Sequence, residues 1–336
     1  MNPNGIVVFG AVFVDIKGYP LAQYIPGGRN VGRVVQVHGG VSRNVAEDIA
    51  NVELRPTFVS VVDETGIGTD VIEKLKRHKV NTSYIRRTPD GLGTWLAVFN
   101  NAGDVTASIS KRPDLSGIRD MLLEKGDEII SRADSVVVEI DMDEDVIKEV
   151  FSFARKYGKR VYALVANMTI ASQRRDFLQR VDCFVCNLQE AGILFADDFE
   201  AEDPQALGRE LPSRVRSAQI PSMVVTLGER GAVYASRDGD FGYCPAQTVR
   251  VRDTAGAGDA FFAGVAMGLT YGRSLRESCE IGARLASSVI TCWKTSVPAS
   301  CRRSWVWRSP SGRGGTELER GPDSAIFLLR HDRPGL

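Results

Sequence analysis

The sequence predicts an α/β fold, in which helices cover a mostly parallel central sheet and a small β lid stands beside it. Short β-branched runs alternate with amphipathic helical segments along most of the chain, which is typical of βαβ units. Residues 19–37 and 93–109 instead alternate like strands without an intervening helix, which indicates the lid. Of the 336 residues, 43% are hydrophobic, so the chain can bury a sizeable core in one large domain or two smaller ones.

The first predicted strand runs from Ile6 to Asp15, is largely apolar and ends in a carboxylate. Because open α/β sheets bind ligands at the carboxyl ends of their strands, Asp15 is a candidate to hold substrate hydroxyls. The next motif, Gly39-Gly-Val-Ser-Arg-Asn44, indicates a glycine turn that enters a helix. Taken alone, Gly39 and Gly40 form an ordinary turn and Asn44 is a candidate helix cap.

The βαβ pattern continues through the middle of the chain. The predicted strands are residues 57–62, 135–140 and 160–165, and the predicted helices are residues 66–78 and 144–157. Within the lid, residues Asn100 to Asp104 are predicted to form a hairpin turn. At the lid edge, Lys111 and Arg112 are two cations that either meet a substrate phosphate or face solvent, and the second alternative is favoured.

Two polar motifs follow later apolar runs. Asn187-Leu-Gln-Glu190 follows the strand predicted at residues 183–186, and on local sequence it favours a helix N-cap with a capping-box acid. Thr226-Leu-Gly228-Glu-Arg-Gly231 follows the strand predicted at residues 223–226. By itself this second motif indicates a turn between strands.

The segment Asp253-Thr-Ala-Gly-Ala-Gly-Asp-Ala-Phe-Phe262 combines a glycine-rich turn, a carboxylate and a helix start. A helix beginning near Gly258 directs its unpaired N–H groups at the turn, which predicts an anion pocket. Gly256 and Gly258 are expected to adopt positive φ and to let a phosphate approach closely. Asp259 beside that pocket is a candidate general base. The alternative is that the small residues only permit close helix packing, with Asp259 as an ordinary first-turn acid.

Together these motifs resemble the signatures of the pfkB (ribokinase-like) carbohydrate kinases, over residues 5–291. The resemblance implies a ribokinase-like three-layer α/β/α sandwich with a β lid. It also implies ATP-dependent phosphoryl transfer to a primary hydroxyl of a sugar or nucleoside, with Mg²⁺ as cofactor and K⁺ as a further candidate. By that resemblance Asp259 is the catalytic base, and Gly256, Ala257 and Gly258 form the anion hole.

The resemblance assigns the other site residues as well. The acceptor would be bound by Asp15, Gly39, Gly40 and Asn44. The nucleotide would be bound by Asn187, Thr226, Gly228, Gly231 and Thr254. Glu190 would support Mg²⁺ indirectly, and Asp253 is a candidate for a monovalent cation.

The acceptor itself stays open. The segment Asp15 to Tyr19, the Gly39 to Asn44 motif and the Asn100 to Asp104 hairpin look most like the pseudouridine kinase branch, with ribose or fructose kinases close behind. Ala166-Asn167 stands where many relatives carry Asp-Pro, so a contact of that Asp cannot be transferred. The main alternative is a catalytically impaired sugar- or nucleotide-binding protein that keeps the fold. An NAD-dependent oxidoreductase fits poorly, because a third glycine at the required spacing is missing.

Composition limits the partners. Lys plus Arg and Asp plus Glu are each 42, so no global field draws the protein to nucleic acid. No apolar stretch reaches the roughly 18 residues of a membrane span, which predicts a cytoplasmic protein without membrane contact. Cys183 and Cys186 lie in an apolar run with no second ligand pair, so buried thiols are expected rather than a zinc site. The lid strands could pair between subunits, which would make a homodimer.

The C-terminal part does not follow the pattern. The kinase-like domain is expected to span residues 1–292, with lid strands from about 16–38 and 91–113, and residues 293–336 form an atypical tail. Codons for Trp293 to Arg308 can be chosen so that dropping two bases yields Glu-Asn-Val-Cys-Pro-Gly-Phe-Leu-Pro-Glu-Glu-Leu-Gly-Leu-Glu, which resembles an ordinary C-terminus of the family. We therefore hypothesise a frameshift near Cys292. It predicts a poorly packed tail and weakened ATP binding. Resequencing that finds this frame intact, with the tail ordered over the nucleotide site, would contradict it.

Overall fold

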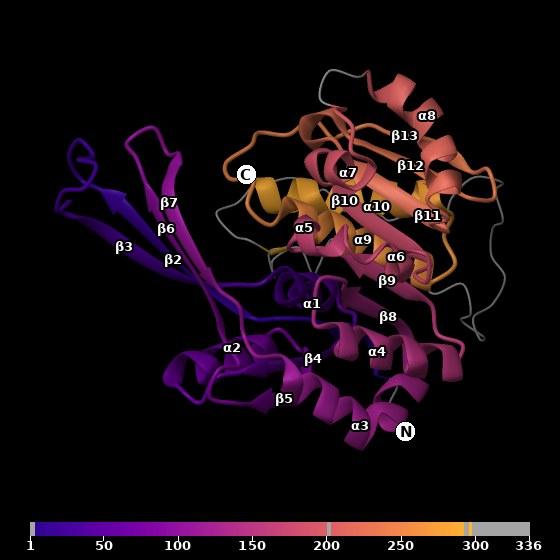
Figure 1. Cartoon of the computed structure of the whole chain (residues 1–336), viewed down its shortest axis with the longest axis horizontal. Helices are drawn as coiled ribbons and strands as arrows, with labels where there is room; N and C mark the ends of the chain where they lie inside the picture. Colours follow the sequence, from indigo (N-terminus) through magenta and orange to yellow (C-terminus); the bar gives the residue numbers. More distant parts are fainter. Residues whose placement is uncertain (1–3, 200–202, 292–295, 298–336) are drawn as a thin grey trace, which may run out of the picture.

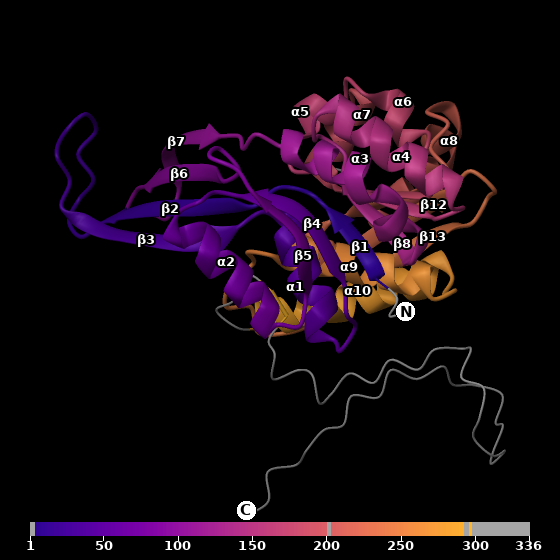
Figure 2. The same ribbon diagram turned by 90° about the horizontal axis from the view of Figure 1, so that it is seen from below.

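The computed structural model describes residues 4–199, 203–291 and 296–297. Over these residues the chain forms a nine-stranded sheet with helices on both faces and a separate four-stranded sheet. Figure 1 shows the smaller sheet projecting from the body of the molecule, and Figure 2 shows the two helical layers on either side of the central sheet. The predicted α/β architecture with a β lid is confirmed.

The central sheet has the strand order β13-β12-β11-β10-β9-β8-β1-β4-β5. All neighbouring pairs from β5 to β11 are parallel, whereas β12 and β13 pair antiparallel at one edge. The strands are β1 (Gly5–Phe9), β4 (Thr57–Val62), β5 (Asn81–Arg87), β8 (Ala133–Glu139), β9 (Val161–Leu164), β10 (Cys183–Asn187), β11 (Ser222–Thr226), β12 (Ala232–Ser236) and β13 (Phe241–Cys244).

Two hydrophobic clusters divide the helices between the faces of this sheet. The first cluster contains side chains of α3 (Ser116–Ser131), α4 (Glu144–Lys156), α5 (Met168–Ala171), α6 (Arg175–Leu178), α7 (Leu188–Phe195) and α8 (Pro204–Ser217). The second contains side chains of α1 (Val41–Asn51), α2 (Gly66–Arg77), α9 (Ala257–Thr270) and α10 (Leu275–Ile290). This is the expected three-layer α/β/α sandwich.

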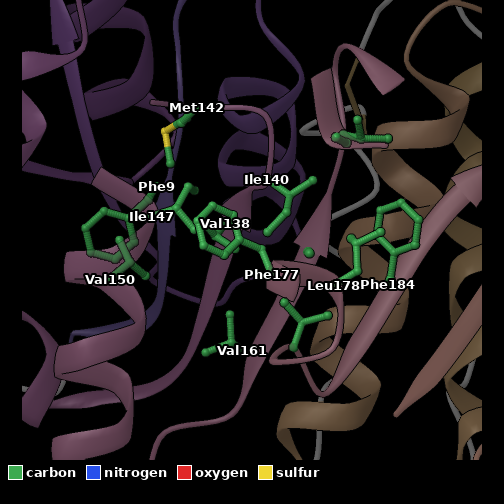
Figure 3. Close-up of a cluster of buried hydrophobic side chains, with 14 of the residues drawn as sticks. Phe9, Val138, Ile140, Met142, Ile147, Val150, Val161, Phe177, Leu178 and Phe184 are labelled. Carbon is green, nitrogen blue, oxygen red and sulfur yellow. The ribbon is translucent and has the colours of Figure 1, made fainter. Parts of the chain in front are cut away.

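Strand alternation explains why both faces of the sheet are apolar. In β1, Val7 and Phe9 belong to the first cluster and Ile6 and Val8 to the second, because successive side chains of a strand point to opposite faces. Figure 3 shows part of the first cluster, where Phe9 and Val138 of neighbouring strands lie beside side chains of α4. A parallel sheet buried on both faces requires such continuous apolar strands.

The lid is the sheet β3-β2-β6-β7, formed by β2 (Phe13–Pro20), β3 (Gly32–Gly39), β6 (Gly93–Phe99) and β7 (Val105–Lys111). The predicted hairpin turn between β6 and β7 is confirmed, since Asn100 N donates to Asp104 O at 2.9 Å. The single strand expected from Ile6 to Asp15 is wrong. The chain leaves the central sheet after Phe9 and enters the lid at Phe13, a change of pairing partner that an unbroken apolar run does not reveal.

Only two residues of the atypical tail are described, and both are buried against α1. Val297 N donates to Asp48 Oδ1 at 2.5 Å, and Asn51 Nδ2 donates to Val297 O at 2.6 Å. Poor packing therefore does not describe Ser296 and Val297. The proposed frameshift position at Cys292 and the remainder of the tail lie outside the described residues. Among the described helices, none has the length and apolarity needed to cross a membrane.

Candidate active site

The glycine-rich turn before α9 takes the form that an anion site requires. Gly256 is the N-cap of α9 and has a φ of 81°, which glycine adopts without steric cost. Asp253 Oδ1 accepts a hydrogen bond from Ala255 N at 2.9 Å and so braces the turn. The helix begins at Ala257, one residue before the predicted start. The expected positive φ of Gly258 is wrong, because this residue already lies in the first helical turn.

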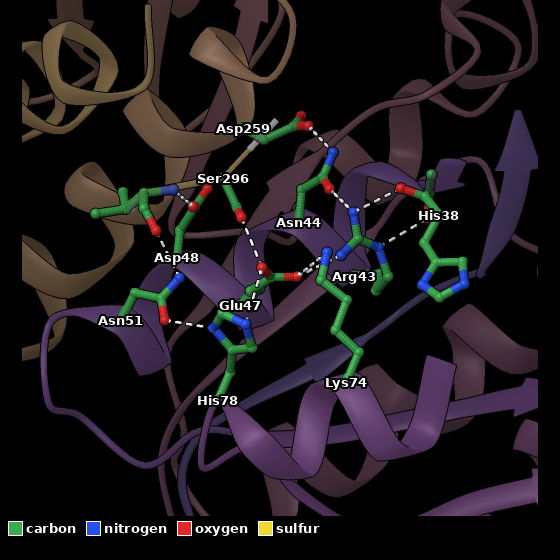
Figure 4. Close-up of polar contacts among 12 residues, drawn as sticks. His38, Arg43, Asn44, Glu47, Asp48, Asn51, Lys74, His78, Asp259 and Ser296 are labelled. Carbon is green, nitrogen blue, oxygen red and sulfur yellow. Dashed lines mark hydrogen bonds and ion pairs between the residues drawn. The ribbon is translucent and has the colours of Figure 1, made fainter. Parts of the chain in front are cut away.

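Asp259 and Asn44 lie 215 positions apart in the sequence, yet the fold brings them into contact. Asn44 Nδ2 donates a hydrogen bond to Asp259 Oδ2 at 2.6 Å. Figure 4 shows this contact between the first turns of α9 and α1. Helix α1 starts after Gly40, whose φ is 96°, and has no side-chain cap. Asn44 is therefore not the helix cap that local sequence favours, because its amide faces the carboxylate instead.

Burial raises the pKa of Asp259 to about 6. The hydrogen bond from Asn44 and the charge of Arg43 oppose this rise, and the nearby charge of Glu190 adds to it. A carboxyl group with this pKa is ionised at neutral pH and close to the range in which proton acceptance is efficient. The pKa and position of Asp259 thus fit the predicted role of a general base beside the predicted anion turn, a role that stays a prediction.

A cavity of about 410 Å³ lies between the lid and the end of the central sheet. Five of the residues predicted to bind substrate or phosphate line it, namely Asp15, Gly39, Gly40, Asn44 and Gly256. The lid also contributes Phe13, Lys17 and Trp95. The cavity therefore joins the predicted acceptor residues to the predicted anion hole at Gly256, whereas Ala257, Gly258 and Asp259 are not among its lining residues.

Asp15 reaches the cavity from β2 of the lid and not from the end of the first strand of the central sheet. Its carboxylate lies 3.7 Å from Lys17 Nζ. Burial raises the pKa of Asp15, and the charges of Lys17 and Arg43 partly offset that rise. Because Asp15 is aligned with Trp95 of β6 across the lid sheet, a carboxylate and an aromatic ring face the same side of the cavity.

Glu139 and Asp141 are cavity residues that sequence reasoning missed. Glu139 Oε2 accepts hydrogen bonds from Ser42 Oγ at 2.8 Å and from Ala11 N at 3.2 Å. Burial, together with the charge of Asp141, raises the pKa of Glu139 to about 8, so this carboxyl is mostly protonated at neutral pH. Glu139 is the last residue of the buried strand β8 and Asp141 follows it, so the strand-end rule that singled out Asp15 would have found them.

The expectation that Arg112 faces only solvent is wrong. Arg112 lines the cavity, and its Nη2 donates to Asp141 O at 2.8 Å. Lys111 does point away, to an exposed ion pair with Asp90 at 2.7 Å. The neighbouring cavity residue Asn167 accepts a hydrogen bond from Ile170 N at 3.4 Å, at the start of α5.

The residues assigned to the nucleotide, except Thr254, lie at or just after the ends of two neighbouring strands, β10 and β11. Asn187 and Glu190 form the capping box of α7, with Glu190 N donating to Asn187 Oδ1 at 2.8 Å. Thr226 ends β11, and the chain turns into antiparallel β12 through Gly228 and Gly231, both with positive φ. The local interpretations of both motifs are thus confirmed, while their nucleotide role stays a prediction, as does that of Thr254 on its exposed turn.

The described residues contain no group of three His, Cys, Asp or Glu side chains placed to hold a metal ion. Glu190 is partly buried and uses one carboxylate oxygen to accept from Asn187 N at 2.7 Å. Such a site suits Mg²⁺, which keeps several waters and binds phosphates together with one or two protein carboxylates. Cys183 and Cys186 are buried free thiols in β10, as expected.

Comparisons with known proteins agree with this geometry. The sequence pattern of the pfkB family carbohydrate kinases matches residues 4–300. The guanosine-inosine kinase of Exiguobacterium acetylicum is 33% identical over 290 residues, covering 85% of this chain and 94% of that protein. The pseudouridine kinase of Escherichia coli (strain K12) is 22% identical over 294 residues, covering 87% and 92%. The structure of Arabidopsis thaliana ribokinase complexed with ribose and ATP superposes with a TM-score of 0.76 at 21% identity, covering 89% of this chain and 96% of that chain.

Proposed function

This chain belongs to the pfkB family of carbohydrate kinases, and we propose that it transfers the terminal phosphoryl group of ATP to the hydroxymethyl group of a nucleoside. The observation that carries the proposal is the contact between Asp259 and Asn44. It joins a carboxylate at an anion-binding helix start to the residues that line the acceptor cavity.

The chemical roles follow from this arrangement. Asp259 takes the proton of the acceptor hydroxyl, whose oxygen then forms the new bond to phosphorus while the bond to the ADP oxygen breaks. The backbone N–H groups of residues 255–258 stabilise charge on the transferring group. Asp15, Gly39, Gly40 and Asn44 orient the acceptor. A buried, mostly protonated Glu139 adds a hydrogen-bond donor to the lining of the cavity.

ATP is expected to bind at the ends of β10 and β11, beside Asn187, Thr226, Gly228, Gly231 and Thr254. When bound, Mg²⁺ would neutralise charge on the phosphates. Glu190 would hold it through water, since the described residues offer no closed ligand set. Asp253 braces the turn before α9 through one oxygen, and its second oxygen is our candidate for a K⁺ ligand.

We favour a nucleoside over a free sugar because of what the lid presents to the cavity. Trp95 and Phe13 supply aromatic faces on which a base can stack, and Asp15 and Arg112 supply polar partners at the rim. The cavity volume of about 410 Å³ lies within the range of roughly 300–1,000 Å³ that small-molecule sites show. The similarity to a guanosine-inosine kinase supports the same choice.

A panel of acceptors tests this function. ADP formation would be measured with Mg-ATP and K⁺ against guanosine, inosine, pseudouridine, uridine, adenosine, ribose and fructose. We expect the highest kcat/KM with one of the nucleosides. The Trp95→Leu variant should lose at least about tenfold in kcat/KM for that nucleoside while changing little toward ribose. A preference for ribose or fructose in both proteins would overturn the choice of a nucleoside.

We also propose that the lid pairs with that of a second copy of this chain. The side of the lid away from Asp15 and Trp95 is apolar, and on it Val34 of β3 is 71%, Leu96 of β6 40% and Ile109 of β7 72% exposed. An exposed apolar sheet face favours association. Sedimentation should show a dimer that Ile109→Lys converts to a monomer, and a monomeric wild-type protein at high concentration would refute the pairing.

A further inference from the structure

Arg43 is a fully buried cation whose guanidinium serves four partners beside the active site. Its Nε donates to Gly39 O at 3.0 Å and its Nη2 to His38 O at 2.9 Å. The same Nη2 donates to Asn44 Oδ1, and Nη1 pairs with Glu47 Oε2 at 2.5 Å. Figure 4 shows these contacts converging on the guanidinium from β3 and α1.

The hydrogen-bonding capacities of the neighbouring groups make the orientation of the Asn44 side-chain amide depend on Arg43. A guanidinium is only a donor, so it can be met only by the carbonyl oxygen Oδ1 of the Asn44 amide. That leaves the NH₂ end of the amide to face Asp259, where an ionised carboxylate is only an acceptor. Among the described residues, the hydrogen bond to Oδ1 comes from Arg43, so removing Arg43 removes the contact that fixes which end of the amide faces Asp259.

We propose that Arg43 is a positioning residue: it fixes the Asn44 amide against Asp259 and ties that contact to the last two residues of the lid strand β3. The link is direct, because the carbonyl groups of His38 and Gly39 and the side chain of Asn44 share one rigid guanidinium. A displacement of the lid end therefore acts on the residue that orients the catalytic carboxylate.

The carboxylate of Glu47 compensates the buried positive charge of Arg43. The same carboxylate also pairs with Lys74 Nζ at 3.2 Å and accepts from Ser296 Oγ at 2.7 Å. Burial alone would raise the pKa of Glu47, but the charges of Arg43, Lys74 and His78 and the hydrogen bond from Ser296 together lower the pKa to about 2. Glu47 thus stays ionised across the working pH range and compensates the guanidinium. A buried ion pair often adds little to the free energy of unfolding. We therefore attribute the Arg43–Glu47 pair to the positioning of side chains beside the site.

The charged groups around Asp259 predict whether its pKa rises or falls when Arg43 is removed. Glu190 of α7 and Asp48 of α1 interact unfavourably with an ionised Asp259, whereas Arg43 favours the ionised form. The Asn44 hydrogen bond favours it as well. Removing Arg43 removes a favourable charge and loosens that hydrogen bond, so Asp259 should bind its proton more tightly.

The test is the titration of Asp259 itself in Arg43→Gln, followed by the side-chain carboxyl ¹³C shift and assigned by its absence in Asp259→Asn. We expect the midpoint to rise by about one unit, with a matching shift of the acidic limb of the kcat profile and a raised KM for the acceptor but not for ATP. Arg43→Lys should lie between the two proteins. Lys76→Gln, which removes an exposed cation paired with Glu73, is the matched control. It should change neither the Asp259 midpoint nor the KM for the acceptor.

Because Arg43→Gln leaves Glu47 with less compensation, Arg43→Gln/Glu47→Gln provides a second protein in which the midpoint should rise as well. An unchanged Asp259 midpoint in either folded variant would overturn the proposal. The kinetic part rests on the proposed function, and the titration does not. If the midpoint rises but the wild-type protein phosphorylates no acceptor, the positioning role stands and the proposed function fails.

Discussion

At the scale of single residues, two carboxyl groups near the cavity differ in charge because their surroundings differ. Burial raises both pKa values, to about 6 for Asp259 and to about 8 for Glu139. Asn44 and Arg43 limit the rise at Asp259, whereas Asp141 adds to it at Glu139. At neutral pH the first group can therefore accept a proton and the second can donate a hydrogen bond.

The raised pKa of Asp259 also predicts a gain in stability on its removal. Since the folded protein binds this proton more tightly than the unfolded chain, the native state loses stability as the pH rises through about 6. Asp259→Asn should raise the free energy of unfolding by about 1–3 kcal/mol at pH 7.5, and the gain should vanish near pH 4. Urea unfolding at both pH values measures this.

The matched control for this prediction is Asp70→Asn, which removes an exposed carboxylate from α2. It should change stability little at either pH. A loss of stability in Asp259→Asn at pH 7.5, or an equal gain at pH 4, would show that Asp259 is not held as a destabilising buried charge.

At the scale of elements, the start of α9 predicts that alanine is tolerated differently at its two glycines, Gly256 and Gly258. Gly256 has a φ of 81°, whereas a Cβ added at Gly258 would meet no atom within 4 Å. Gly256→Ala should therefore cost about 1–2 kcal/mol of unfolding free energy. Gly258→Ala should be neutral or stabilise the helix by up to about 1 kcal/mol. Chemical unfolding of the two variants compares them directly, and equal losses would contradict the conformation assigned to this turn.

Most elements could be predicted from the sequence, because hydrophobic period and glycine turns act locally. The strand at Thr57–Val62 and the helix from Glu144 are found where expected. The passage of the chain from β1 to the lid was missed, since it depends on which strands pair. Arg43 was missed as a site residue for a similar reason. A charged residue on a helix normally faces solvent, whereas Arg43 is buried with its partners Glu47, Asn44 and the carbonyl groups at the end of β3, an arrangement that only the folded chain reveals.

At the scale of the whole molecule, the fold brings three distant segments to one place. The lid supplies Asp15 and Trp95, the start of α1 supplies Asn44, and the start of α9 supplies Gly256 and Asp259. A lid that closes over the cavity would exclude water, which competes with the acceptor for the phosphoryl group. Of the motifs found in the sequence, the structure brings Asp15, the turn at residues 39–40 with Asn44, and Gly256 around one cavity, while the nucleotide role of the motifs after β10 and β11 stays a prediction. The acids at the end of β8 were missed, although their position at a strand end could have indicated them.

The most direct test of the central claim is ³¹P NMR of ATP turnover with the best nucleoside acceptor, comparing the wild-type protein with Asp259→Asn. We predict that the wild-type protein forms ADP and a nucleoside 5′-monophosphate in equal amounts, and that the variant remains folded with kcat lowered by about 10² or more. Equal turnover by both proteins, or ADP formation without a phosphorylated acceptor, would contradict the account.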